Sequence, residues 1–384
     1  MTRPHEHHPP RASHDPWPCY ARGFTIVEML VVVSIIGVLM ALLLPAVGRA
    51  RTSARIAVSA TNLHQIGIAH ASYAADWDGR QMTFAVDNIA NYGNDPETAA
   101  LMYKLNGPTG EYPQGVILGW SPRPGGGSAL DAFYIGPDNP TNYEWMQPII
   151  FDQASTRVGL GWFRIPNARP LNQYLGGRFY DPVFYAPQDV IVMDRFRVVE
   201  DMPGEYIHTE NSNPGEVNWE NPCWSSYCTS PAALLNPTVM SADGWQDPWS
   251  LPAGFRAPSF SQAAYSDLKT HVMEHQWLQG RRKECNAAAP RVNYGICEPF
   301  YFNHSRDSSP QALFYDGHVG QVGVRQAELA DGRIGTETGA GLWSRTTPFG
   351  PDGYFGDIGY DDAKTSFHIL TVDGIRGRDV LGGS

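Results

Sequence analysis

The stretch that decides the fold lies near the N-terminus and reads FTIVEMLVVVSIIGVLMALLL, from Phe24 to Leu44. As a helix, these 21 residues would be roughly 31 Å long, which matches the hydrocarbon thickness of a bilayer. Arginines both precede and follow the segment, so the positive-inside rule gives it no clear orientation. The segment predicts one membrane-spanning helix.

Glu28 is the one charged residue inside this segment. A carboxylate there costs about 2.5–3.5 kcal/mol on membrane-insertion scales. A signal anchor or a secretory signal peptide would also place a basic region before an apolar run, but neither explains the acid. The apolar run offers no partner of its own, so we expect a neighbouring subunit to supply one.

The residues RGFTIVE, from Arg22 to Glu28, resemble the N-terminus of type IV prepilins and type II secretion pseudopilins. The resemblance implies that prepilin peptidase cuts after Gly23 and that Phe24 is then methylated. It also implies that Glu28 pairs with the N-terminal amine of an adjacent pilin or pseudopilin subunit. The implied location is the bacterial inner membrane, as a single-pass protein whose head lies in the periplasm or on the cell surface within a filament.

Beyond Pro45 the apolar residues continue at helical spacing as far as Trp77, which predicts one helix from Phe24 to about Trp77. We expect a kink or local melting at Pro45, because proline removes a backbone donor. Asp78 and Gly79 supply a stop signal. The predicted divisions are a cleaved leader, a transmembrane half-helix, an amphipathic half-helix and an extracytoplasmic head, at residues 1–23, 24–47, 48–78 and 79–384.

Composition predicts a turn-rich head, since the chain has 39 glycines and 31 prolines. The net charge of −11, without a dense Lys/Arg run, argues against nucleic acid as a partner. The fold class expected is α+β and pilin-like, with the long N-terminal helix packed on an antiparallel β-sheet and a large loop-rich head. Strands are predicted where β-branched and aromatic residues concentrate, at residues 188–199, 312–315, 318–324 and 367–372.

Four cysteines would remain after loss of the leader, and an even number in an exported domain favours disulfides. Three connectivities are open, of which the pairs close in sequence are the simplest. A four-cysteine zinc site is the rival, but the spacing lacks its usual close pairs. The disulfide candidates are Cys223, Cys228, Cys285 and Cys297.

A second resemblance lies in the head, where His304 precedes Asp316-Gly317. It is similar to the C-terminal signature of a prepilin-type subfamily in which nine residues separate histidine from Asp-Gly, whereas eleven do so here. The dipeptide Asp316-Gly317 is a strong hairpin signal between two predicted strands. We expect His304 to brace that turn rather than to bind a metal, because two ligands are too few to define a site.

The segment His271-Val272-Met273-Glu274-His275 matches the H-x-x-E-H pattern of inverted zinc peptidases. On a helix, His271, Glu274 and His275 would share one face, with two ligands and one general base. The flanking apolar residues do not form a clean helical stripe, so we expect a polar strand or helix edge instead.

Carboxylates interleaved with glycines near the C-terminus could ligate calcium, although their spacing is not that of an EF-hand. Solvated loop residues are the simpler interpretation. These weak metal candidates are Asp352, Asp357, Asp361 and Asp362.

Together these patterns predict a structural subunit, minor or specialised, of a type IV pilus or type II secretion pseudopilus, and not an enzyme. Its expected partners are prepilin peptidase, other pilin or pseudopilin subunits and the membrane, and no cofactor is expected unless calcium binds. Two alternatives stay open. One is a membrane-tethered zinc hydrolase, and the other is a membrane-anchored surface binding module that keeps residues 1 to 23.

Overall fold

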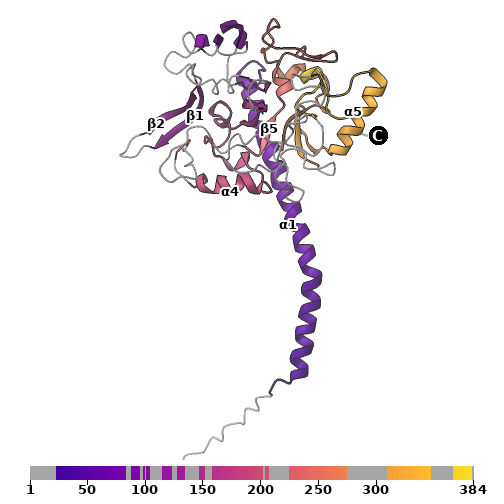
Figure 1. The fold of residues 1–384 in the computed structure, drawn as a ribbon. Coiled ribbons are helices and arrows are strands. Elements are labelled where there is room, and N and C mark those ends of the chain that lie inside the picture. Colours follow the sequence, from indigo (N-terminus) through magenta and orange to yellow (C-terminus); the bar gives the residue numbers. More distant parts are fainter. Residues whose placement is uncertain are drawn as a thin grey trace, which may run out of the picture. The chain divides into compact units, whose positions relative to one another are not determined.

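The computed structural model describes residues 23–83, 88–95, 98–99, 101–103, 115–122, 128–134, 147–151, 158–201, 204–206, 225–274, 309–346 and 366–382. The chain forms two compact units, Met1–Arg51 and Thr52–Ser384. The fold class is α+β, with one long N-terminal helix, an antiparallel four-stranded sheet and a loop-rich head (Figure 1). This is the predicted class.

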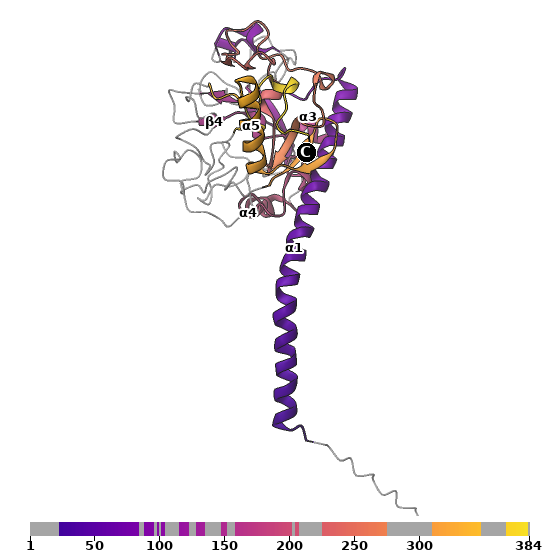
Figure 2. The same cartoon turned by 90° about the vertical axis from the view of Figure 1, so that its right-hand side faces the viewer.

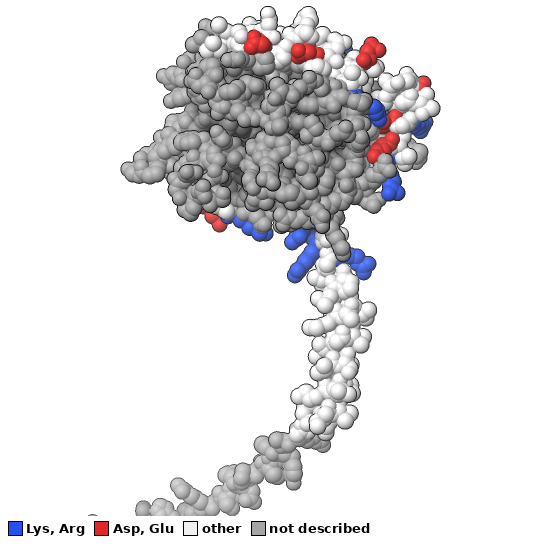
Figure 3. Space-filling view, viewed as in Figure 1, with Lys and Arg blue, Asp and Glu red and all other residues white. Residues whose placement is uncertain are grey.

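The helix α1 runs without interruption over Ile26–Asp76, which confirms the long predicted helix. Local melting at Pro45 was a wrong expectation, because the helix continues through the proline. Only one backbone donor is lost there, and the neighbouring helical bonds carry the segment past it. All side chains of α1 up to Arg51 are exposed, and Figure 3 shows the helical surface in this first unit as largely uncharged. Among the described residues, α1 is the one helix long and apolar enough to cross a membrane.

Helix α1 ends where the Asp-Gly stop signal was predicted. Gly79 N donates to Ala74 O at 2.7 Å, which satisfies a carbonyl of the last turn as in a Schellman motif. Asp78 has φ 53° and Gly79 has φ 76°. The left-handed position directly after the helix is therefore held by Asp78, a residue type that tolerates it, and glycine occupies the next position.

The central sheet has the strand order β10-β9-β8-β5 and is antiparallel throughout. Its strands β9 and β10 form the predicted hairpin, with Val319 paired to Leu313. A register shift between Thr270 and Val272 marks a bulge in β8. The bounds are Tyr227–Thr229 for β5, Thr270–Glu274 for β8, Gln311–Phe314 for β9 and Val319–Gln321 for β10.

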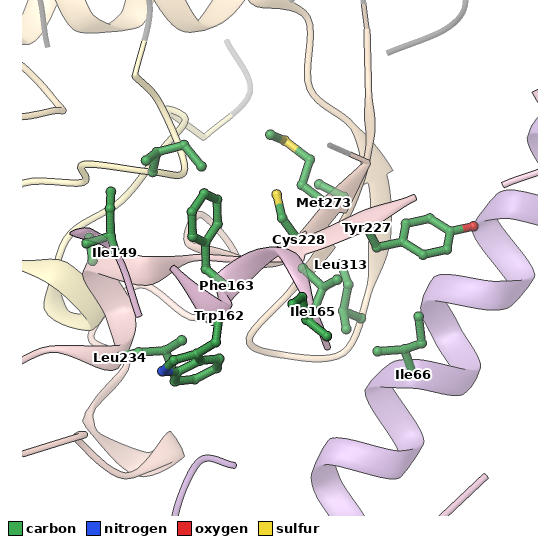
Figure 4. Packing of buried hydrophobic residues seen from close by; sticks show 14 of the residues in the cluster. Ile66, Ile149, Trp162, Phe163, Ile165, Tyr227, Cys228, Leu234, Met273 and Leu313 are labelled. Carbon is green, nitrogen blue, oxygen red and sulfur yellow. The ribbon is translucent and has the colours of Figure 1, made fainter. Parts of the chain in front are cut away.

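One face of this sheet is covered by the second half of α1. Leu63 and Ile66 are completely buried, and Figure 4 shows Ile66 and Tyr227 in the space between the helix and the sheet. Gly67 sits against β9, where a Cβ would lie 3.0 and 3.1 Å from the two δ carbons of Leu313. The absence of a side chain at Gly67 thus allows the helix to approach the sheet closely.

The opposite side of the sheet is covered by irregular chain rather than by a long helix. Cys228, which alternates with Tyr227 along β5 and so faces this side, has its Sγ 3.6 Å from His368 Nε2, and Ala232 N donates to Ile369 O at 3.2 Å. An aromatic stretch fills much of this core, and its completely buried rings include Phe163, Phe179 and Phe184. Irregular segments therefore supply much of the hydrophobic core of the head.

Further short elements surround this core, with α3 and α5 visible together in Figure 2. Three antiparallel pairs are β1 with β2, β3 with β4 and β6 with β7. Their bounds are Gly115–Pro122, Ser128–Tyr134, Ile150–Phe151, Val158–Leu160, Met240–Ser241 and Gly244–Trp245. The helices are α3 at Arg169–Asn172, α4 at Val190–Val199 and α5 at Val324–Thr338. Short 3₁₀ helices occupy Ile89–Tyr92 (η1), Trp162–Arg164 (η3), Pro182–Phe184 (η4), Pro231–Leu234 (η5), Phe260–Gln262 (η6) and Gly374–Arg376 (η7).

The predicted strand at residues 188–199 is wrong, because most of it forms the helix α4. Asp189 accepts a hydrogen bond from Val192 N at 3.1 Å. This N-cap starts a helix in spite of the β-branched residues that follow, whose helix penalty is small beside tertiary packing.

Two other predicted strands also need correction. Residues 367–372 form turns, with a single bridge between Thr371 and Trp343. His368 has φ 70°, a left-handed conformation that a strand cannot continue. The strand predicted at 318–324 is shorter than expected, because β10 ends at Gln321 and α5 begins at Val324.

We predict that Gly67→Leu lowers the free energy of unfolding by about 1–3 kcal/mol, because the new side chain would overpack against buried Leu313. The matched control is Gly332→Leu in α5, where a Cβ would meet no atom within 4 Å. That change should stabilise the protein slightly through helix propensity. Thermal unfolding of the detergent-solubilised full chain compares the two, and equal behaviour would contradict the close helix-sheet approach.

Candidate functional site

The residues of the predicted processing boundary lie at the start of α1. Phe24 is 66% exposed. Thr25 N and Thr25 Oγ1 each donate to Glu28 Oε2 at 2.8 Å, and Glu28 N donates back to Thr25 Oγ1 at 3.3 Å. This reciprocal arrangement is a capping box. The side chains of Thr25 and Glu28 each accept a hydrogen bond from the backbone N–H group of the other residue, and these groups are otherwise free in the first turn of a helix.

The expectation that the apolar run holds no partner for Glu28 is therefore wrong. The T-x-x-E spacing of Thr25 and Glu28 was a sequence signal that could have revealed the bond. Its hydrogen bonds satisfy one carboxylate oxygen but do not neutralise the charge. The charge of Glu28 would still need a cation in an apolar medium.

The second half of α1 is held on the sheet by four polar side chains, here called the helix clasp: Ser59, Asn62, Tyr227 and Glu274. Ser59 Oγ donates to Glu274 Oε1 at 2.5 Å and lies 3.0 Å from Tyr227 Oη. Asn62 Nδ2 donates to Tyr227 Oη at 3.3 Å. Gln311 N donates to the second oxygen of Glu274 at 2.9 Å. Burial raises the pKa of Glu274, and the two bonds to its oxygens oppose that rise.

Comparison with known families gives a match to the prokaryotic N-terminal methylation motif over residues 19–44. That range contains the predicted cleavage boundary, the capping box and the apolar first part of α1. The chain is a type IV prepilin-like or pseudopilin-like protein. Neither the curated proteins nor the solved structures contain a match, so the likeness rests on this N-terminal segment.

The Asp-Gly turn of the head is formed as predicted. Gly317 has φ 91°, which glycine adopts without strain, and Phe314 N donates to His318 O at 2.9 Å across the hairpin. His318 Nδ1 lies 2.6 Å from Asp316 Oδ1, and the His318 ring stacks on Phe314 at 4.1 Å. His318 thus contacts the turn directly. His304, which was expected to brace it, lies outside the described residues.

The helix that a zinc site at the H-x-x-E-H pattern would need does not form, because His271 and Glu274 belong to strand β8. Three residues span about 10 Å along a strand, so the two side chains do not converge as they would on a helix. Each instead contacts α1: His271 meets the ring of His70, and Glu274 bonds Ser59. The strand is also buried rather than an exposed edge. His275 lies outside the described residues.

Most of the predicted disulfide and calcium residues lie outside the described residues: Cys223, Cys285, Cys297, Asp352, Asp357, Asp361 and Asp362. Cys228 is buried on β5, and its Sγ lies 3.6 Å from His368 Nε2. The disulfides and the calcium site stay predictions. Within the described ranges, no group of three or more His, Cys, Asp or Glu side chains could hold a metal ion.

A buried ion pair on the other side of β8 was not found by sequence reasoning. Lys269 Nζ donates to Asp379 Oδ2 at 2.7 Å, to Ser230 Oγ at 2.8 Å and to Thr371 Oγ1 at 2.9 Å. Thr270 N and Thr270 Oγ1 donate to the same Asp379 oxygen. Burial alone would raise the pKa of Asp379, but Lys269 and these donors lower it to about 2. Because Lys269 and Asp379 are 110 residues apart, no local sequence pattern could predict that they form an ion pair.

His70 faces the sheet from α1 and is almost completely buried. Its ring contacts His271 at a centroid distance of 4.5 Å, and neither ring nitrogen of His70 has a hydrogen-bond partner within the described part of the chain. Burial lowers the pKa of His70 to about 3, and burial also lowers the pKa of His271. The folded protein therefore keeps this pair neutral, since protonation would place an unsolvated cation in the helix-sheet interface.

We predict that His70 makes the head less stable as the pH falls from about 6.5 towards 3. The unfolded chain binds the proton in this window and the folded chain does not, so this residue alone costs about 2 kcal/mol of stability at pH 5. Unfolding of the full chain at pH 7 and pH 5 should show a smaller pH effect in His70→Leu. His64→Leu, at an exposed position of the same helix, is the control. An unchanged pH effect in His70→Leu would refute the assignment.

Proposed function

We propose that this chain is a structural subunit of a type IV pilus or type II secretion pseudopilus. In this proposal prepilin peptidase removes residues 1 to 23, Phe24 becomes the methylated N-terminus, and the subunit anchors by α1 in the bacterial inner membrane with its head in the periplasm or at the cell surface. The single observation that carries the proposal is the methylation motif at residues 19–44, whose helical part, from Ile26 to Leu44, has only exposed side chains.

The exposed surface of α1 supports assembly. Ile26 is 87% exposed and Leu44 is 71% exposed, and each such side chain gains about 1.5–3 kcal/mol when it leaves water. Lipid satisfies this surface in the membrane, and the matching surfaces of other subunits would satisfy it in a filament. The same residues can serve both states because each is apolar.

Apolar packing does not by itself fix how adjacent subunits are positioned, and the charge of Glu28 would fix this position. Thr25 satisfies part of its hydrogen-bonding capacity, and the remaining need is for a positive charge. Cleavage after Gly23 would create an α-amino group on Phe24. Pairing of that amine with Glu28 of an adjacent subunit would neutralise two charges that are each costly alone in an apolar environment.

The size of the head favours a minor or specialised subunit. Residues 79–384 follow the helix, and so many residues in every protomer would crowd a shaft built from closely packed helices. The proposal is therefore that other, smaller subunits form most of the assembly.

Intact-mass and N-terminal mass spectrometry of the membrane-extracted protein tests processing. We expect a chain that begins at Phe24 and carries one additional methyl group on its amine. Gly23→Leu should retain the leader, because a bulky side chain at the cleavage position would block the peptidase. A mature protein that keeps residues 1 to 23 would instead support the uncleaved, membrane-anchored binding module.

Replacement of Glu28 separates charge from hydrogen bonding. Glu28→Gln can still accept bonds from Thr25 but has no charge, so we expect its incorporation into the native assembly to fall by about tenfold or more. Thr25→Val removes the side-chain bond and keeps the charge, and should have a much smaller effect. Incorporation is measured by immunoblotting of isolated assemblies, normalised to processed subunit in the membrane.

Normal incorporation of Glu28→Gln, at an unchanged membrane level, would reject charge pairing as the driving interaction. The apolar helix would then act as a simple tether.

A further inference from the structure

A polar pocket of about 480 Å³ lies in the head, beyond the C-terminal end of α1. Its volume falls within the range of roughly 300–1,000 Å³ that is common for small-molecule sites. Three arginines line it, Arg80, Arg256 and Arg376, together with one acid, Asp78. The local excess of positive charge contrasts with the net charge of −11 for the chain.

The three arginines come from separate parts of the sequence, and each is exposed at the pocket. Within the described residues, the guanidinium groups of Arg256 and Arg376 form no ion pair or hydrogen bond with another side chain. The three positive charges at this pocket outnumber its one acid, Asp78, so like charges there repel one another. An oxyanion placed between them would remove this repulsion and accept paired N–H donors.

The walls of the pocket are held by backbone contacts rather than by loose side chains. Arg80 and Ser259 form an antiparallel bridge, and Phe260 N donates to Gly79 O at 3.0 Å. Gln81 is almost completely buried, and its Nε2 donates to Pro258 O at 2.8 Å. The end of α1 is thus joined directly to the segment that carries Ser259 and Gln262.

The turns that present the other two arginines are equally defined. Arg256 N donates to Ala253 O and Arg376 N donates to Asp373 O, each at 3.0 Å. Ala253 and Asp373 have φ 55° and 59°, unusual values for residues other than glycine. Next to Arg376, a Cβ on Gly374 would lie 2.6 Å from Ala232 O. The backbone positions of both arginines are therefore set before any ligand arrives.

The remaining lining groups indicate more than a bare inorganic anion. Gln262 contributes a side-chain amide and Ser259 a hydroxyl, and Asp78 contributes a carboxylate that can only accept hydrogen bonds when ionised. Such groups complement the hydroxyls of a ligand, while the arginines complement its charge.

We propose that this pocket binds a small polyhydroxylated anion, of the size of a sugar that carries one carboxylate or phosphate group. Arg256 and Arg376 bind the oxyanion, Arg80 adds positive charge at the same wall, and Asp78 and Gln262 bind hydroxyls. All residues that line the site belong to the second compact unit, Thr52–Ser384.

Isothermal titration of the detergent-solubilised full chain tests the proposal, with glucuronate, glucose 6-phosphate, inorganic phosphate and glucose as probes. We expect one equivalent of glucuronate or glucose 6-phosphate to bind, inorganic phosphate to bind more weakly, and glucose not to bind. Arg256→Gln and Arg376→Gln should each weaken binding of the two sugar acids by about tenfold, the loss of one charge-assisted contact.

The control is Arg333→Gln, an arginine on α5 that pairs with Glu337 outside the pocket, and its affinity should match the unmodified protein. Because Arg256 and Arg376 are exposed, the variants should keep the thermal unfolding midpoint. The proposal is overturned if neither sugar acid binds, or if both bind equally well to Arg256→Gln and Arg376→Gln. Equal affinity for inorganic phosphate and the sugar acids would overturn the role of the hydroxyl-binding groups.

Discussion

The packing of the second half of α1 on the four-stranded sheet is the contact on which the head depends. Leu63 and Ile66 are buried there, and the helix clasp adds directional hydrogen bonds from Ser59 and Asn62 to the sheet. Burial supplies most of the free energy, since the net gain from one hydrogen bond is only about 1 kcal/mol. The clasp fixes register, because a helix displaced by one turn would leave Oε1 of the buried Glu274 carboxylate without its donor Ser59.

Polar groups are used in quite different ways on the two sides of this sheet. On the helix side, His70 and His271 are kept neutral by burial. On the other side, Lys269 and Asp379 are buried as an ion pair with additional donors from Thr270. A buried pair of this kind adds little net stability, but loss of either partner would leave an unsolvated charge. The irregular segments that cover that side are therefore held in one arrangement.

The first part of α1 and the head expose surfaces of different character. The first part of α1 presents an exposed apolar surface that lipid or other subunits can cover. Glu28 is the one charged residue in its apolar segment. The head is polar and irregular outside its core, and its arginine-lined pocket gathers residues from several segments. Under the two proposals, assembly would use the first part of α1 and ligand binding would use residues of the head.

The amino-acid sequence by itself determined the features whose causes are local: the long N-terminal helix, its stop at Asp78-Gly79, the Asp316-Gly317 turn and the N-terminal motif. Apolar periodicity and turn chemistry act within a few residues, so they can be read without knowing the rest of the chain. The capping box of Thr25 and Glu28 was equally local, although its T-x-x-E spacing was not used.

Only the tertiary structure decided what depends on distant partners. Residues 190–199 have β-branched side chains but form a helix that Asp189 caps, and residues 367–372 form turns around His368. His271 and Glu274 became core residues because α1 covers their strand. The pocket brings Arg80 and Arg376 together although nearly 300 residues separate them. Such contacts arise from the packing of the whole chain, which no local propensity encodes.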